Sequence, residues 1–197
     1  MKLEIVCAGI GGRGVLLAST ILMETAIQAG YKAIASDEYG MSQRGGSVVS
    51  LIKVGDFASP LIGRENADIL LAFEESEFYK TLFFLKKGGT AVINTGKAAL
   101  PEPVSNLLRQ RNIRCFFINA DGIATEKKLV QSANMALLGF FSTLSIGPFT
   151  MENIEGMITR KVPAKFLEKN REVFHEGAKN VQGSRCLSSR SGGEVQG

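Results

Sequence analysis

The amino-acid sequence predicts an α/β protein: one domain with a mainly parallel sheet flanked by helices, a Rossmann-like start and a helical C-terminal portion. Short apolar runs rich in strand formers alternate with segments whose apolar residues recur every three or four positions. Glycines separate many of these segments, and no strand-like run follows residue 118. Strands that alternate with helices form βαβ units, which build a mainly parallel sheet. The length of 197 residues fits one domain.

The first part of the chain supplies a strand, a helix and two further strands. Residues 3–8 form a short apolar run that ends at glycines, which is typical of a strand buried on both faces. Residues 15–29 repeat apolar side chains at helical spacing, and Gly30 ends this helix. The next strands are expected at residues 31–35 and 47–54.

The second part continues the alternation and then becomes helical. We expect strands at residues 68–73, 90–94 and 114–118 and helices at residues 74–86 and 102–111, with a turn at Lys87-Gly88-Gly89. Later helices are expected at residues 121–130, 134–144, 151–158 and 163–179. We assign residues 1–182 to the domain, and residues 183–197, rich in Ser, Gly and Arg, to a disordered tail.

The composition argues against several classes of protein. The net charge is +4, but the basic residues are scattered, so we expect no nucleic-acid binding. No apolar run approaches the roughly 20 residues of a membrane helix, and the N-terminus lacks a secretory signal, so we expect a cytoplasmic protein. Cys7, Cys115 and Cys186 form no CxxC pair, and His175 is the single histidine. We therefore expect no metal site or iron–sulfur cluster in this chain.

The segment Gly9-Ile10-Gly11-Gly12-Arg13-Gly14 fits the pattern G-x-G-x-x-G between the first strand and its helix. Glycines bring the free amides of a helix N-terminus close to an anion. Asp37-Glu38 lies at the end of the second strand, just after residues 31–35, where a Rossmann protein would hold an adenosine ribose. The segment is either a dinucleotide-binding loop or a purely structural turn.

Arg13 is the unusual residue of this glycine loop. A cation in the first turn of a helix faces the positive end of the helix dipole. Its presence suggests a nearby carboxylate, phosphate or partner protein; otherwise its long side chain reaches solvent.

A second loop, residues 38–47, places Gln43 and Arg44 before two glycines. Such a loop can present the guanidinium at the carboxyl edge of the sheet, where α/β proteins bind ligands, and we favour this over a flexible crossover. We predict no catalytic residue, and we predict a ligand-binding or interface loop composed of Gly9, Gly11, Gly12, Arg13, Gly14, Gln43, Arg44, Gly45 and Gly46.

Both loops, in this order, carry a family resemblance. With the segments Ala67–Glu74, Gly89–Thr95 and Asn134–Gly139, they make residues 3–180 resemble the gamma subunit or domain of the 2-oxoacid:ferredoxin oxidoreductases. Within this family the sequence is most similar to the beta subunit of the indolepyruvate type. The chain departs from the family at Arg13, where Gln is usual.

The resemblance implies a non-catalytic subunit of an enzyme that oxidatively decarboxylates 2-oxoacids to acyl-CoA and passes electrons to ferredoxin. It implies a hetero-oligomer in which a large partner subunit carries thiamine diphosphate, magnesium and iron–sulfur clusters, and ferredoxin is reached through the complex. It places this domain near the CoA end of the partner's site. The alternatives are a stand-alone NAD- or FAD-binding oxidoreductase of Rossmann type and a regulatory binding module.

Overall fold

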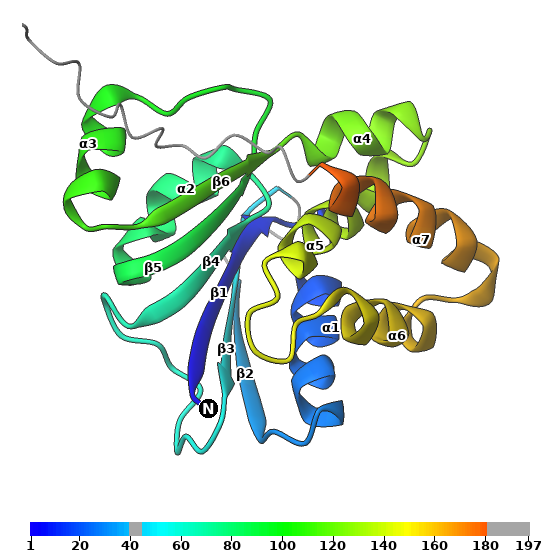
Figure 1. Cartoon of the computed structure of the whole chain (residues 1–197), viewed down its shortest axis with the longest axis horizontal. Coiled ribbons are helices and arrows are strands. Elements are labelled where there is room, and N and C mark those ends of the chain that lie inside the picture. Colours follow the sequence, from blue (N-terminus) through cyan, green and yellow to red (C-terminus); the bar gives the residue numbers. More distant parts are fainter. Residues whose placement is uncertain (40–44, 181–197) are drawn as a thin grey trace, which may run out of the picture.

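A six-stranded sheet runs through the centre of the computed structural model, which describes residues 1–39 and 45–180 (Figure 1). The strand order is β2-β3-β1-β4-β5-β6. The strands are β1 (Leu3–Ile10), β2 (Ala33–Tyr39), β3 (Ser47–Val54), β4 (Ala67–Ala72), β5 (Leu85–Asn94) and β6 (Arg114–Ile118). Residues 183–197, for which a disordered tail is predicted, lie outside the described residues.

All of these strands except β3 point in the same direction. β1 pairs parallel with β4, and β4, β5 and β6 continue the parallel arrangement. β3 pairs antiparallel with both β1 and β2 and separates them. Only residues 40–46 join β2 to β3, whereas a parallel crossover needs about a dozen residues or more. The sheet is therefore mainly parallel, as predicted, with one antiparallel strand inserted into its Rossmann-like start.

Helices cover both faces of the sheet (Figure 1). One layer contains α1 (Val15–Gln28), α4 (Ala120–Glu126), α5 (Ala133–Thr143), α6 (Met151–Lys161) and α7 (Ala164–Lys179), which share a core with Ile5 and Cys7 of β1. The other contains α2 (Glu75–Thr81) and α3 (Glu102–Gln110), which share a second core with Val6 and Ala8 of β1. Because successive side chains of β1 point to opposite faces of the sheet, the strand contributes to two separate hydrophobic cores.

Two expected helices are shorter than predicted. The helix expected at residues 74–86 ends at Thr81, and a 3₁₀ turn, η1 (Leu82–Phe84), leads directly into β5. The expected turn at Lys87-Gly88-Gly89 lies inside β5, where the pairing with β4 shifts register after Ala67 pairs with Leu85. The helix expected at residues 121–130 ends at Glu126, and a second 3₁₀ turn, η2 (Val130–Ser132), precedes α5.

The helices α5 and α7 pack closely because each contributes a glycine to their contact. A Cβ atom at Gly139 would overlap the carbonyl oxygen of Phe174, and one at Gly177 would overlap that of Ala136. The two backbones therefore touch without intervening side chains.

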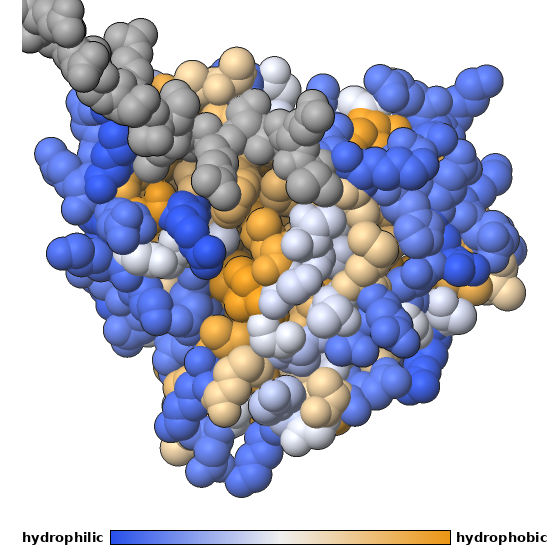
Figure 2. Space-filling model, viewed as in Figure 1, coloured by the Kyte–Doolittle hydropathy of each residue, from blue (hydrophilic) through white to orange (hydrophobic). Residues whose placement is uncertain are grey.

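The surface is largely hydrophilic on the face shown in Figure 2, with a band of hydrophobic residues over β1. Within residues 1–39 and 45–180, no helix has the length and apolar character required to cross a membrane.

Candidate functional site

The candidate site lies at the carboxyl edge of the parallel strands, where β1 and β4 are neighbours. The chain leaves β1 for α1 in one helical layer and leaves β4 for α2 in the other. Ligands of open α/β sheets bind at such a switch point, because the two connections diverge and leave a crevice. The glycine loop after β1 lies at this position.

The structure joins the glycine loop to the end of the second predicted loop. The backbone N–H of Gly11 donates to the carbonyl oxygen of Gly46 at 2.9 Å, and Gly9 pairs with Val48 in the sheet. The left-handed conformation of Gly12, Gly14 and Gly45 (φ 91°, 71° and 80°) explains why glycine occupies these positions. Gln43 and Arg44, the other predicted members, lie outside the described residues.

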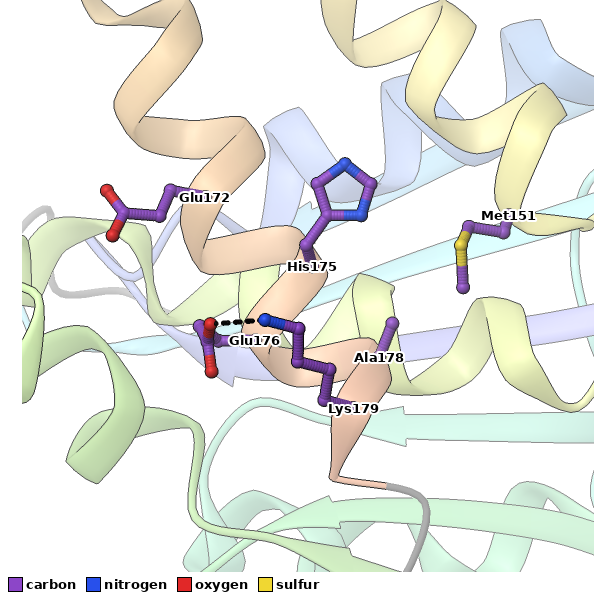
Figure 3. A pocket seen from close by; sticks show the side chains of 6 residues that line it. All are labelled: Met151, Glu172, His175, Glu176, Ala178 and Lys179. Atoms are coloured by element: carbon purple, nitrogen blue, oxygen red, sulfur yellow. Dashed lines mark hydrogen bonds and ion pairs between the residues drawn. The ribbon is translucent and has the colours of Figure 1, made fainter.

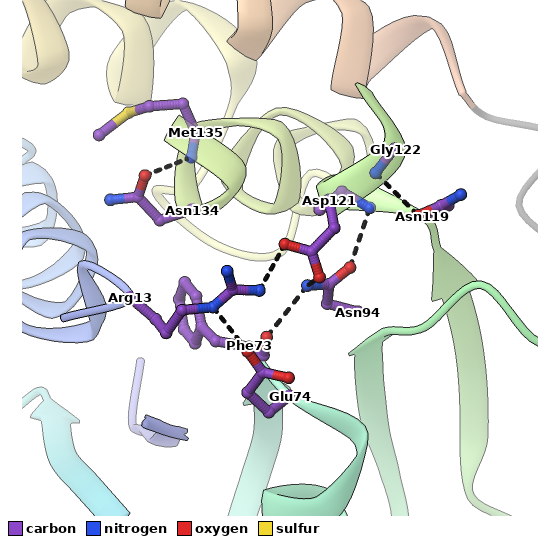
Figure 4. Close-up of polar contacts among 10 residues, drawn as sticks. Arg13, Phe73, Glu74, Asn94, Asn119, Asp121, Gly122, Asn134 and Met135 are labelled. Atoms are coloured by element: carbon purple, nitrogen blue, oxygen red, sulfur yellow. Dashed lines mark hydrogen bonds and ion pairs between the residues drawn. The ribbon is translucent and has the colours of Figure 1, made fainter. Parts of the chain in front are cut away.

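Arg13 is held by two carboxylates (Figure 4). Its Nε lies 2.6 Å from Oε1 of Glu74, which directly precedes α2, and its Nη2 pairs with Oδ1 of Asp121 in the first turn of α4. The expectation of a nearby carboxylate is therefore confirmed. The Arg13 side chain is only 28% exposed, and two negative charges face its one positive charge. Arg13 thus forms two ion pairs within the chain, and little of its positive charge remains for an external anion.

Asn94, the last residue of β5, extends this network. Its Nδ2 donates to the carbonyl oxygen of Phe73 at 3.0 Å and to Oδ2 of Asp121 at 2.8 Å. Its Oδ1 accepts the N–H of Ala120 at 2.9 Å. Asn94 and Asp121 were missed by the sequence reasoning, although each is a polar residue at or just after the carboxyl end of an expected strand. That position was the available signal.

Asn134 fixes the far side of the glycine loop. This buried side chain lies near the start of α5, and its Nδ2 donates to the carbonyl oxygen of Gly14 at 3.2 Å. A Cβ atom at Gly14 would overlap this amide. The N-terminus of α1 is therefore packed against a protein side chain.

The structure argues against the dinucleotide-binding interpretation of the loop, because the acidic residues expected to bind the ribose are displaced. In the Rossmann arrangement the strand bearing the ribose-binding acid is the neighbour of β1. Here β3 intervenes, so Asp37 and Glu38 of β2 lie two strand spacings, about 10 Å, from β1. The carboxylates are exposed at the edge of the sheet, beyond the expected ribose position.

The described cysteines do not fit an iron–sulfur cluster. Cys7 lies in the core beneath α1 and Cys115 in the core on the opposite face of the sheet, so the two cannot bind one cluster. Burial, with a smaller contribution from the charge of Asp37, raises the pKa of the Cys7 thiol far above its usual range, and ligation requires the thiolate. In the described ranges, no three His, Cys, Asp or Glu residues gather as metal ligands, and Cys186 lies outside those ranges.

Comparison with known proteins gives matches over nearly the full chain. The family described as pyruvate ferredoxin/flavodoxin oxidoreductase matches residues 4–180. The indolepyruvate oxidoreductase subunit IorB of Archaeoglobus fulgidus is 31% identical over 90% of this chain and 94% of its own length. The 2-oxoglutarate synthase subunit KorC of Methanothermobacter marburgensis is 30% identical over 90% of this chain and 95% of its own length.

Solved structures share the fold. The gamma subunit of a keto/oxoacid ferredoxin oxidoreductase from Geobacter sulfurreducens is 28% identical, with a TM-score of 0.73, over 91% of this chain and 98% of that subunit. A 2-oxoglutarate:ferredoxin oxidoreductase chain from Magnetococcus marinus, 21% identical, has the same fold with a TM-score of 0.74 over 91% of this chain and 31% of its own. This chain belongs to the pyruvate ferredoxin/flavodoxin oxidoreductase family.

Proposed function

We propose that this chain is a non-catalytic subunit of an indolepyruvate (aryl 2-oxoacid):ferredoxin oxidoreductase. Such an enzyme oxidatively decarboxylates a 2-oxoacid to an acyl-CoA thioester and transfers the electrons to ferredoxin. The observation that carries the proposal is the near end-to-end match to subunits named for indolepyruvate oxidoreductase, at 31% identity in both Archaeoglobus fulgidus and Pyrococcus horikoshii.

The redox chemistry belongs, in this proposal, to a large partner subunit that holds thiamine diphosphate, magnesium and iron–sulfur clusters. The separation of Cys7 and Cys115 into opposite cores supports this division of labour. The complex is a cytoplasmic hetero-oligomer. Ferredoxin is a partner of that complex and not of this chain alone.

The glycine loop is the proposed contact with the partner's site. Gly11, Gly12, Arg13 and Gly14 reach the surface beside Gly45 and Gly46 at the carboxyl edge, which supports one continuous contact surface. Gly9 is buried in the sheet and supports this surface from beneath. Gln43 and Arg44 belong to the same proposed surface. This surface lies toward the CoA-binding side of the partner. The ion pairs of Arg13 with Glu74 and Asp121 hold the surface in a fixed shape.

The test is anaerobic reconstitution from separately purified subunits. We expect indolepyruvate- and CoA-dependent reduction of ferredoxin by the complex, and none by this chain alone. Parallel assays with pyruvate and 2-oxoglutarate identify the substrate class. Turnover by the isolated chain, or a large subunit whose activity is the same with and without it, would contradict the proposal.

A further inference from the structure

A groove of about 740 Å³ lies beside the glycine loop. It is bordered by Gly12 and Gly14, by the segment 128–132 that contains η2, and by the start of α7. Its volume is in the range of sites that receive a ligand or an anchoring side chain.

Several of the side chains that line this groove are large and apolar, and they are exposed to solvent. Leu17 of α1, Val130 of η2 and Phe166 of α7 are 37%, 56% and 49% exposed. Single exposed apolar residues are ordinary, but a group of them around one hollow is typical of an interaction site. The three come from separate elements, so the fold brings them together.

The charge of the groove has one sign. Lys128 and Lys169 line it, and none of its described lining residues is Asp or Glu. Lys165 adds a positive charge over the ring of Phe166, 4.7 Å from its centroid. By contrast, the pocket formed by Met151 and α7 includes Glu172 and Glu176 (Figure 3). Of these two pockets, only the groove beside the glycine loop combines lysines with a lining free of carboxylates among its described residues.

Lys128 is held in place by its backbone. It lies just past the end of α4 with φ 57°, a left-handed conformation usually taken by glycine. Its N–H donates to the carbonyl oxygen of Thr125 at 2.9 Å, and the N–H of Leu129 donates to that of Ala124 at 2.7 Å. These bonds fix the ammonium-bearing residue at the rim of the groove.

We propose that this groove receives an acidic segment of the large partner subunit, with an apolar side chain inserted between Val130 and Phe166. The inference rests on the proposed function and adds to it the surface and the chemistry of the contact. The lysines supply charge complementarity, and the apolar residues supply the desolvated anchor typical of interfaces. A second copy of this chain is disfavoured, because each copy carries a net charge of +4.

The experiment measures the Kd of the purified large subunit for variants of this chain. We expect Phe166→Ser and the double variant Lys128→Glu/Lys169→Glu to raise the Kd at least tenfold. In the double variant, added salt is expected to strengthen binding instead of weakening it, because the charge reversal replaces a screened attraction with a screened repulsion. Ile27→Ser and Lys87→Glu, exposed residues outside the groove, serve as matched controls and are expected to stay within twofold of the wild type.

Lys128→Gly separates binding from folding. Glycine relieves the left-handed strain, so this variant is expected to melt at a higher temperature while it binds the partner more weakly. Even if Phe166→Ser lowered the melting temperature, opposite changes of stability and affinity in Lys128→Gly would assign the effect to the groove.

The outcomes for the groove and for the proposed function are distinct. If the wild-type chain fails to bind the large subunit, both the proposed function and the groove assignment are contradicted. A wild-type complex that tolerates all groove variants overturns the groove assignment alone. The same assignment is overturned if the groove variants abolish self-association or a melting shift caused by a nucleotide while leaving the subunit Kd unchanged.

Discussion

Arg13 links three segments that are distant in the sequence. Its guanidinium joins the glycine loop to Glu74, after β4, and to Asp121, after β6. Asn94 then connects Asp121 to the backbone that ends β4. A single side chain thereby fixes the relative position of three strand ends, which a glycine-rich loop could not do by its backbone alone.

Arg13→Ala leaves two half-buried carboxylates without their shared cation. We expect it to lower the free energy of unfolding by about 1–2 kcal/mol, measured by urea denaturation at pH 7. Arg13→Gln is expected to lose less, because the amide can still donate to one carboxylate. Arg160→Ala, at an exposed position on α6, is the control, and an equal loss in this control would contradict the assigned role of Arg13.

At the scale of elements, the contact between α5 and α7 depends on the absence of side chains at two positions. Gly177→Ala would push its methyl group into the carbonyl oxygen of Ala136, so we expect a loss of about 3 kcal/mol in unfolding free energy. Gly156→Ala, in the exposed part of α6, meets no atom within 4 Å and should stabilise the protein by about 0.5–1 kcal/mol. Urea denaturation measures both, and a stable Gly177→Ala variant would refute the close approach of the helices.

The contact between α6 and α7 is electrostatic where it reaches solvent. Oε1 of Glu155 lies 2.9 Å from Nε of Arg171 and 2.8 Å from Nε2 of His175. Burial by itself raises the pKa of Glu155, but the hydrogen bonds from Arg171 and His175 outweigh burial and lower that pKa below its ordinary value. The folded state thus favours the ionised carboxylate.

This pKa shift gives a pH dependence with a definite sign. A carboxyl group whose pKa is lower in the folded protein stabilises it above the unfolded pKa of about 4.3, and this contribution is lost as the pH falls through the folded pKa. Glu155→Gln should therefore cost about 1 kcal/mol at pH 7 and progressively less below pH 5, as measured by urea denaturation at each pH. The exposed Glu126→Gln should show no comparable trend, and a constant difference for Glu155→Gln would exclude the mechanism.

The sequence predicted most of the elements, and the differences have local causes. The apolar runs located the strands in the interior of the sheet, because burial demands them. The edge strand β2 was expected at residues 31–35 but spans Ala33–Tyr39, since its second half is polar and exposed and forms a strand by pairing with β3. The start of β5 was placed too late, since Lys86, Lys87 and two glycines resemble a turn, whereas Leu85 is buried and pairs with Ala67. The insertion of β3 depends on pairing between strands, which periodicity within one strand does not encode.

The site was predicted in part for a similar reason. The glycine loop could be found because its residues are consecutive, and the carboxylate near Arg13 was expected from the helix dipole. Asp121 follows an expected strand, but its pairing with Arg13 could not be predicted, and neither could the contact of Asn134 with Gly14, since both depend on the order of the strands and the packing of α4 and α5. Contacts that span more than 100 residues are properties of the topology.

At the scale of the whole molecule, one topological feature separates this fold from a dinucleotide-binding protein of similar sequence pattern. The inserted β3 moves β2 to the edge of the sheet, and with it Asp37 and Glu38. At the carboxyl ends of the central strands, Arg13 is neutralised by Glu74 and Asp121, and Asn134 packs against Gly14. The loop keeps the glycine pattern but has neither the ribose partner nor a free cation.

The isolated chain should therefore not respond to dinucleotides. A ligand that binds the folded state raises the melting temperature, by an amount equivalent to about 2.7 kcal/mol at one hundred times its Kd. We expect no change in melting temperature with NAD or FAD at millimolar concentration, and a clear increase when the chain is bound to its large subunit. The Asp37→Asn variant is the matched control. If NAD raised the melting temperature of the wild type but not of this variant, the dinucleotide-binding interpretation would be restored. Such a result would require Asp37 to contact the ribose, which the separation of β2 from β1 argues against.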